Sequence, residues 1–428
     1  MLGIILGLAL LMFLAYRGWS VIWIAPITAG VVALFGGLDL LPAYTDTYMG
    51  GFVNFAKTWF PVFMLGAIFG KLMQDTGAAQ SVAYWVTKFI GTKRAILAVI
   101  AGAVVLTYGG VSVFVVVFAI YPLSIALFRE ANITRRLIPG TIALGSFTFT
   151  MTALPGTPQI QNLIPMQYYG TGPTAAPIIG IVSAIIMAVG GYWYLTWREK
   201  KYTAKGIVFD EPDDQDIEAI EVNKLPNPFL SILPLLTVVF TLNILEWDII
   251  MALISGILLI MILNLKLYKK FVSAINGGAS GSVIAIINTS AAVGFGTVVR
   301  AVPGFQDLTD IVLGIEGNPL ISQAVAVNVL AGATGSASGG MGIALEALGS
   351  RYYELSISSG ISIDAFHRIA SIASGGLDSL PHNGAVLTLL AITGLTHKDS
   401  YKEIFVVACL IPILAVIIGI SLASVGII

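Results

Sequence analysis

Long apolar blocks alternate with short polar stretches along the whole chain. The nearly charge-free blocks are 2–16, 21–36, 95–106, 178–197, 229–245, 249–265 and 404–428. A helix needs roughly 20 residues to cross about 30 Å of hydrocarbon. Several blocks reach that length and several fall short. The pattern therefore predicts an all-α polytopic membrane protein in which some of the helices are broken.

Composition supports this class. The 428 residues are 57% hydrophobic and 11% charged, about half the charged fraction of a typical soluble domain. The formal net charge of −1 gives no indication of nucleic-acid binding. Cys409 lies in an apolar run, where it is expected to be a small packing residue. No cofactor is indicated. The first block lacks the basic preface of a cleavable signal and is expected to be a retained span.

The basic residues favour one orientation, because Lys and Arg concentrate on cytoplasmic loops. Placing Arg17 inside gives 17 of the 22 Lys and Arg residues a cytoplasmic position, namely Arg17 and five loop clusters. Both termini then face outward. The acidic segment 200–228 becomes a cytoplasmic linker, and its charges are those of a solvated segment. The predicted location is the bacterial inner membrane.

The two parts on either side of this linker, 1–199 and 229–428, read as repeats. One constant offset along the chain, which we call the repeat shift, places Gly109 on Gly335, Ser112 on Ser338, and Leu154-Pro155 on Leu380-Pro381. Each half opens with two spans that we expect to be long, continues through two interrupted stretches and ends with a long span. Because equivalent spans run in opposite directions in the predicted topology, the repeats are inverted, as in many secondary transporters.

Each half contains two interruptions at expected membrane depth. They read LTYGGVSVF (106–114) and TALPGTPQIQN (152–162) in the first half, and GATGSASGGMG (332–342) and GGLDSLPHNGAV (375–386) in the second. Gly and Pro free backbone groups that hydrocarbon cannot satisfy, so such breaks are expected to line an enclosed polar cavity. Freed N–H groups at helix N-termini suit a carboxylate.

The alternative is that the small residues only allow close helix packing, which we favour for isolated glycines such as Gly30 and Gly256. Packing does not account for the clustered Pro, Gln, His and Asn of the second break in each half. The predicted substrate-binding residues are Tyr108, Gly109, Gly110, Ser112, Pro155, Gly156, Thr157, Gln159, Asn162, Thr334, Ser336, Ser338, Gly339, Ser379, His382 and Asn383.

The stretch GGLDSLPHNGAVLTLL, followed by GLTHKDSYKEIF, resembles the gluconate permease (GntP) family of the ion transporter superfamily. The resemblance covers the whole chain. It implies proton-coupled uptake of hydroxy-acid anions such as gluconate, and within the family the chain looks most like members for short acids such as 3-hydroxybutyrate. The superfamily implies a homodimer, re-entrant hairpins, and an elevator-like movement of a transport domain against a scaffold.

Asp378 and His382 are the candidate coupling residues. Ionisable groups within spans are costly and are functional candidates, and His titrates near physiological pH. Their partners under the repeat shift are Thr152 and Gly156, so the titratable pair exists in one half only. Asp378 has two alternative roles: capping a half-helix, or binding sodium. His367, Arg368 and Asp364 are expected at an interface.

Two rival classes are weaker. HExxH is absent, and no oxyanion arrangement accompanies Ser379 and His382, which disfavours an intramembrane enzyme. A channel also uses broken helices; saturable uptake with counterflow would distinguish a carrier from it.

None of the four interruptions contains Lys or Arg. This absence favours a small organic monocarboxylate over a citrate-like trianion.

Overall fold

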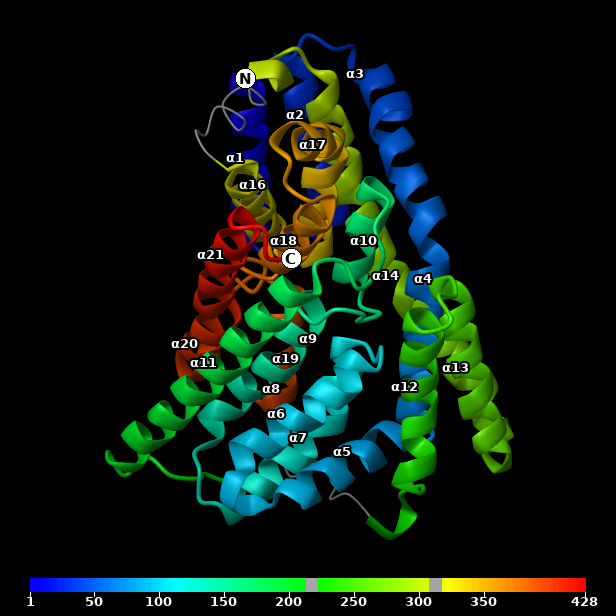
Figure 1. The fold of residues 1–428 in the computed structure, drawn as a ribbon, viewed down its shortest axis with the longest axis vertical. Helices are drawn as coiled ribbons and strands as arrows, with labels where there is room; N and C mark the ends of the chain where they lie inside the picture. Colours follow the sequence, from blue (N-terminus) through cyan, green and yellow to red (C-terminus); the bar gives the residue numbers. More distant parts are fainter. Residues whose placement is uncertain (213–221, 308–317) are drawn as a thin grey trace.

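The computed structural model describes residues 1–212, 222–307 and 318–428, and these residues form helices and connecting turns without a strand (Figure 1). The first half contains α1 (Leu2–Tyr16), α2 (Val21–Phe35), α3 (Leu40–Pro42), the π-helix η1 (Ala43–Tyr48), α4 (Met49–Asp75), α5 (Ala78–Ile90), α6 (Ala95–Tyr108), α7 (Val113–Glu130), α8 (Ile138–Ser146), α9 (Phe149–Thr152), α10 (Ile160–Tyr169) and α11 (Pro177–Thr203). The second contains α12 (Pro228–Asn243), α13 (Ile249–Leu263), α14 (Tyr268–Ala301), α16 (Pro319–Thr334), α17 (Ala337–Ser359), α18 (Ile363–Ser374), α19 (Gly384–Thr393), α20 (His397–Phe405), the π-helix η6 (Val406–Leu410) and α21 (Ile411–Ser424). The all-α prediction is confirmed for this part of the chain.

Five helical stretches in the described ranges are long and apolar enough to cross a membrane: 40–75, 113–130, 177–203, 265–301 and 397–424. A sixth is the pair 78–90 and 92–108, bent by 95°, where Gly91 has a φ of +81°. The prediction that each half opens with two long spans is wrong in the length of those spans. The helices there, α1, α2, α12 and α13, have only 15 or 16 residues.

The order of helices repeats along the chain. α6 ends at Tyr108 and α16 at Thr334, two positions that the repeat shift pairs, and it pairs in the same way the ends of two long stretches, Asp75 and Ala301. Contacts between the halves are reciprocal. α2 packs on α14 while α13 packs on α4, and α7 packs on α19 while α17 packs on α10. Each half thus supplies the same surfaces to the other.

α4 and α14 cross in extensive contact between the two halves. A Cβ built on Gly278 would lie 2.6 Å from the Cα of Ile68, and one on Gly294 would lie 2.8 Å from the carbonyl oxygen of Tyr48, the last residue of η1 directly before α4. The two backbones therefore touch directly, as small residues permit in membrane helices. The main hydrophobic core extends from this crossing over most of the remaining helices, and a smaller core joins α1, α2, η1 and the end of α14.

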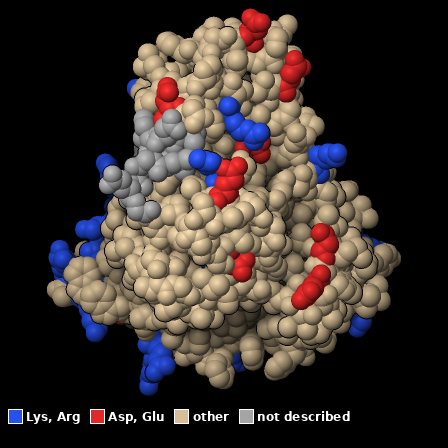
Figure 2. Space-filling model, turned by 45° about the horizontal axis from the view of Figure 1, so that its top comes forward, with Lys and Arg blue, Asp and Glu red and all other residues tan. Residues whose placement is uncertain are grey.

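The predicted linker is described only in part, since Asp213, Asp214 and Asp216 lie outside the described residues. Of its other acidic residues, Asp210 pairs with Arg135 at 2.8 Å and Glu211 with Arg129 at 2.6 Å. On the face drawn in Figure 2 most of the surface is uncharged, and several basic side chains lie along its lower margin. Cys409 is buried in η6, as its apolar run predicts.

Candidate functional site

One cavity of about 510 Å³ collects residues from all four predicted interruptions. Two interruptions form what we call the N-side of the cavity, with Gly110, Ser112, Pro158, Gln159 and Gln161 in its wall. The other two form the C-side, with Thr334, Ser336, Ser338, Gly339, Asp378, His382 and Asn383 in its wall. The volume lies in the range of small-molecule sites.

Four helices begin at the cavity wall, which explains why the interruptions lie there. These helices are α7 and α10 on the N-side and α17 and α19 on the C-side. The first N–H groups of a helix have no partner within it and carry partial positive charge. The lining residues include no Lys or Arg among those described. Helix N-termini are therefore the main source of positive potential in the wall itself.

On the C-side, side chains cap both helix N-termini. The Ser336 hydroxyl accepts a hydrogen bond from the backbone N–H of Gly339 at 3.1 Å. The Asn383 carboxamide accepts from the N–H of Val386 at 2.9 Å and donates to the carbonyl of Gly335 at 2.9 Å. This second bond ties α19 to the turn between α16 and α17. Side chains of the C-side itself therefore already accept hydrogen bonds from some of the backbone N–H groups at the start of α17 and α19.

The C-side also holds the titratable groups of the wall, Asp378 and His382. Asp378 is buried and accepts a hydrogen bond from the Ser379 hydroxyl at 3.1 Å. Hydroxyls of Ser336 and Thr289 each lie 3.4 Å from that of Ser338. A ligand at this side meets hydroxyls that either donate or accept, beside one carboxyl group and one imidazole.

On the N-side neither helix has a side-chain cap: none is found for Ser112 at α7 or for Gln159 at α10. Gln159 instead donates to the carbonyl of Thr107 at 2.7 Å, which braces the second break against the first. Gln161 is 8% exposed, and its Oε1 has no hydrogen-bond partner among the residues that the structure describes. An unpaired buried oxygen is costly unless a ligand or water meets it. The other N-side lining residues include the apolar Val113, Phe114 and Ile160, and the neighbouring Phe63, Phe147 and Met151 are also apolar.

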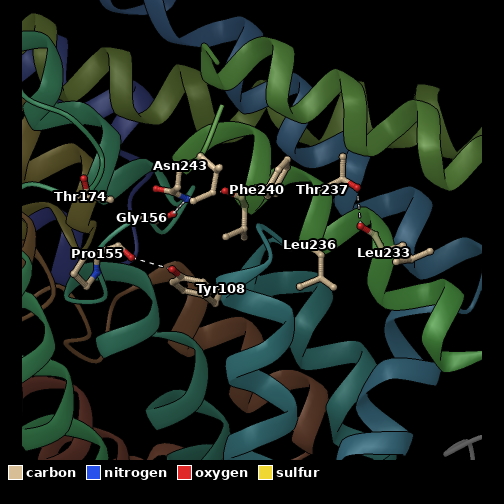
Figure 3. A pocket seen from close by; sticks show the side chains of 11 residues that line it. Tyr108, Pro155, Gly156, Thr174, Leu233, Leu236, Thr237, Phe240 and Asn243 are labelled. Carbon is tan, nitrogen blue, oxygen red and sulfur yellow. Dashed lines mark hydrogen bonds between the residues drawn. The ribbon is translucent and has the colours of Figure 1, made fainter. Parts of the chain in front are cut away.

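Three of the predicted site residues line a different cavity. Tyr108, Pro155 and Gly156 face α12 across a largely apolar space of about 690 Å³ (Figure 3). The Tyr108 hydroxyl donates to the carbonyl of Pro155 at 2.9 Å, and Asn243 donates to that of Gly156 at 2.9 Å. These bonds satisfy carbonyl groups that the break leaves without helical partners. The three residues therefore stabilise the break from behind and do not line the shared cavity.

Four further predicted residues lie behind the wall of the shared cavity. Gly109 packs against Leu235 of α12. Thr157, Asn162 and Ser379 are buried and do not line the cavity. Asn162 donates to the carbonyls of Thr157 at 3.0 Å and Pro173 at 2.8 Å, which closes the second break of the N-side.

The prediction that His367 and Arg368 lie at an interface is wrong: both are fully buried in α18, and only Asp364 is partly exposed. Arg368 donates to Asn162 Oδ1 at 2.7 Å and to the carbonyl of Ala175 at 2.7 Å and 2.9 Å. His367 lies 3.2 Å from the same Oδ1 and 2.6 Å from the Thr171 hydroxyl. A helix of the second half thereby anchors a break of the first.

The cavity has contributors that the interruptions do not reveal. Trp19 and Ser20 come from the α1–α2 turn, Gly66 from α4, and Asn288 and Thr289 from α14. The repeat shift pairs Asn288 with Val62 and Thr289 with Phe63, and all four line the cavity. Extending the internal alignment into the regular helices is the signal that would have found them. No group of three His, Cys, Asp or Glu in the described residues suits a metal ion.

Comparison with known proteins decides the class of this site. A model of the GntP family permeases matches residues 1–264. The chain belongs to the GntP permease family. An uncharacterized transporter of Bacillus subtilis, YxjC, is 43% identical over 94% of each chain. An uncharacterized transporter of Haemophilus influenzae is 24% identical, covering 78% of this chain and 77% of that protein.

Membership fixes the coarse function. GntP proteins are permeases, so this chain is a membrane transporter and not an enzyme. The predicted family and transporter class are thereby confirmed. The cavity where four helices begin is the candidate place for the transported molecule in this GntP protein.

Proposed function

We propose that this GntP permease is a secondary active transporter that carries a small organic hydroxymonocarboxylate, such as 3-hydroxybutyrate or gluconate, together with a proton. The observation that carries the proposal is the convergence of four helix N-termini on one cavity with no Lys or Arg in its described wall. Helix N-termini stabilise a single carboxylate well. A trianion would bring three charges to a wall without a basic side chain, which disfavours citrate-like substrates.

The proton is assigned to Asp378 and His382. Asp378 is buried at the cavity and its neighbour Ser379 donates to it at 3.1 Å. Protonation removes the cost of a buried charge, so occupancy of the cavity by an anion and protonation at this place favour each other. Sodium bound at Asp378 is the second candidate, because the same carboxylate would ligate a cation.

The transport mechanism we propose is an elevator in a homodimer, with the two halves as inverted repeats. The reciprocal packing of the halves supports a two-fold relation between them. The direct backbone contact of α4 and α14 supports a scaffold built around that pair, with the cavity helices α7, α10, α17 and α19 in the moving part. We further propose that both termini lie outside and the linker lies in the cytoplasm of a bacterial inner membrane.

The test is uptake into liposomes reconstituted with purified protein. We expect 3-hydroxybutyrate or gluconate to accumulate under an inward proton gradient, with counterflow and without a requirement for sodium. Citrate in excess is expected not to compete. Potent inhibition by citrate would overturn the monocarboxylate assignment, and uptake driven by sodium alone would replace the proton. Empty liposomes and a proton ionophore are the controls.

A further inference from the structure

Arg368 is a buried cation that forms no ion pair with the described residues and is surrounded mainly by neutral groups. Its side chain is fully buried, and its hydrogen bonds go to Asn162 Oδ1 and to the carbonyls of Pro173 and Ala175. Within the described ranges it takes part in no ion pair shorter than 4 Å. Burying an unpaired charge is expensive, and neutral acceptors solvate it without cancelling it. The Asp364 carboxylate, one turn earlier on α18, acts on the guanidinium only from beyond ion-pair distance, so it offsets the positive charge in the interior only in part.

This charge lies directly behind the N-side of the cavity. Asn162, which accepts the guanidinium hydrogen bond at 2.7 Å, follows Gln161 in the chain, and Gln161 lines the cavity. The N-side also begins α7 and α10, whose N-termini have no side-chain cap. Three sources of positive potential thus coincide on one side. The C-side instead has the carboxyl group of Asp378.

The repeat supplies a comparison within the molecule. The repeat shift pairs Arg368 with Ile142, a fully buried aliphatic residue. Packing at this place in the fold thus needs only an apolar side chain, and the cation is present in one half alone. A structural role in closing the break accounts for the hydrogen bonds of Arg368. It does not account for a permanent charge where neutral donors would satisfy the same carbonyls.

We propose that Arg368 is a positioning residue that directs the substrate carboxylate to the N-side of the cavity. The hydroxyl-bearing part of the substrate then lies at the C-side, against Ser336, Ser338 and Asp378. This inference rests on the proposed function, because it assumes that the ligand is an anion. Arg368 acts on the substrate through the electric field of its fixed charge in a low-dielectric interior, and through its hydrogen bond to Asn162, which fixes the geometry of the break.

The test uses charged thiol reagents and needs no substrate. Ser112→Cys on the N-side and Ser338→Cys on the C-side, at positions that the repeat shift pairs, are made singly in a Cys409→Ser background. Each is labelled with an anionic and with a cationic methanethiosulfonate of similar size, and rates are followed by mass spectrometry. Taking the ratio of the two rates removes any change in thiol ionisation, which affects both reagents equally.

Three changes then separate charge from structure. Arg368→Gln removes the charge but keeps a donor, while Arg368→Lys keeps the charge but loses the planar fork. Asn162→Asp places a carboxylate at the guanidinium and cancels its charge, and it also gives up the two hydrogen bonds that the Asn162 amide donates to Thr157 and Pro173. We expect Arg368→Gln and Asn162→Asp to lower the anion-to-cation ratio at position 112 by about tenfold. Arg368→Lys is expected to change it by no more than about twofold.

Position 338 is expected to respond less than position 112. The matched control is Arg300→Gln, which removes an exposed cation paired with Glu346 at 3.6 Å and is expected to leave both ratios unchanged. Equal ratios in all Arg368 variants, or equal losses in the Gln and Lys variants, would overturn the proposal. If Arg368→Gln does not fold, the ratio in Asn162→Asp decides the question, with Asn162→Ala as its control because it loses the same two donated hydrogen bonds without adding a charge. Wild-type protein that transports none of the acids defeats the proposed function while the reagent ratios still report on Arg368.

Discussion

The N-side and the C-side of the cavity come from equivalent segments of the repeat but differ in how their helix N-termini are used. Ser336 and Asn383 cap the C-side helices with their own side chains. The N-side helices have no such caps, and a buried cation lies behind them. Only the C-side has titratable groups in the wall. The repeat thus has uncapped helix N–H groups on the N-side and titratable side chains on the C-side. In the proposed mechanism this difference separates anion binding from proton coupling.

The largest expected effect tests whether the two helices that meet at the first break pack in the same way on the N-side and on the C-side. Gly340 of α17 lies against the backbone of Ala331 in α16, and a Cβ there would overlap it. The equivalent N-side residue is Phe114, which is 46% exposed and lines the cavity. We expect Gly340→Phe to abolish folded protein, because the clash is with backbone and exceeds the roughly 1–3 kcal/mol of ordinary overpacking.

Phe114→Gly is the matched control and is expected to yield monodisperse protein on size-exclusion chromatography. A folded Gly340→Phe protein with a normal melting temperature would mean that the two helix pairs pack alike. The difference between the sides would then lie in polar groups alone.

Charge asymmetry gives the next largest effect. We expect Asp378→Asn to abolish accumulation driven by a proton gradient, a loss of about tenfold or more, because the amide cannot take up the coupled proton. Counterflow at equal substrate concentrations is expected to persist within about twofold. The control is Thr152→Ser at the equivalent N-side position, which should leave both rates unchanged. Gradient-driven accumulation by Asp378→Asn would remove this residue from coupling.

The two buried asparagines are expected to differ in what they stabilise. Asn162→Ala removes the acceptor of the Arg368 guanidinium, and we expect it to lower the free energy of unfolding by about 3 kcal/mol, as for a lost hydrogen bond to a buried charge. Asn383→Ala removes a helix cap and is expected to lower it by about 1 kcal/mol. Thermal unfolding in detergent measures both. Equal shifts would mean that Arg368 finds another acceptor.

The smallest expected effect concerns the caps themselves. Ser336→Ala loses the bond to the N–H of Gly339 and should cost about 1 kcal/mol of stability. Ser112→Ala loses no cap and should change stability by less than about 0.5 kcal/mol. With the transported acid present, however, Ser112→Ala is expected to lose more ligand-induced stabilisation than Ser336→Ala. The reverse order would place the carboxylate at the C-side.

Sequence reasoning located the cavity because closely spaced Gly, Pro and polar residues favour a helix interruption, and such clusters are visible in the chain. Ser112, Gln159, Ser338 and His382 reach the wall for that reason. It did not separate wall from backing: Tyr108, Pro155 and Gly156 lie in the same interruptions but face α12. Which way a broken segment turns depends on its neighbours and not on its own composition.

Regular helices were harder to interpret. Asn288 and Thr289 lie within α14, whose sequence has no break and little amphipathic pattern, because lipid and protein interior are both apolar. Arg368 was expected at an interface, and nothing in its own segment of the sequence indicates the burial. Its burial depends on carbonyls of the loop at 173–175, which belongs to the other half of the chain.

The glycine contacts of α4 with α14 have a mechanical consequence. Where Gly278 meets Ile68 and Gly294 meets Tyr48, no side chain separates the two main chains. Side chains that change rotamer act as a deformable layer between sliding helices, and at these two points that layer is missing. We therefore expect α4 and α14 to move as one rigid body. Any rearrangement that changes access to the cavity must carry both helices or neither.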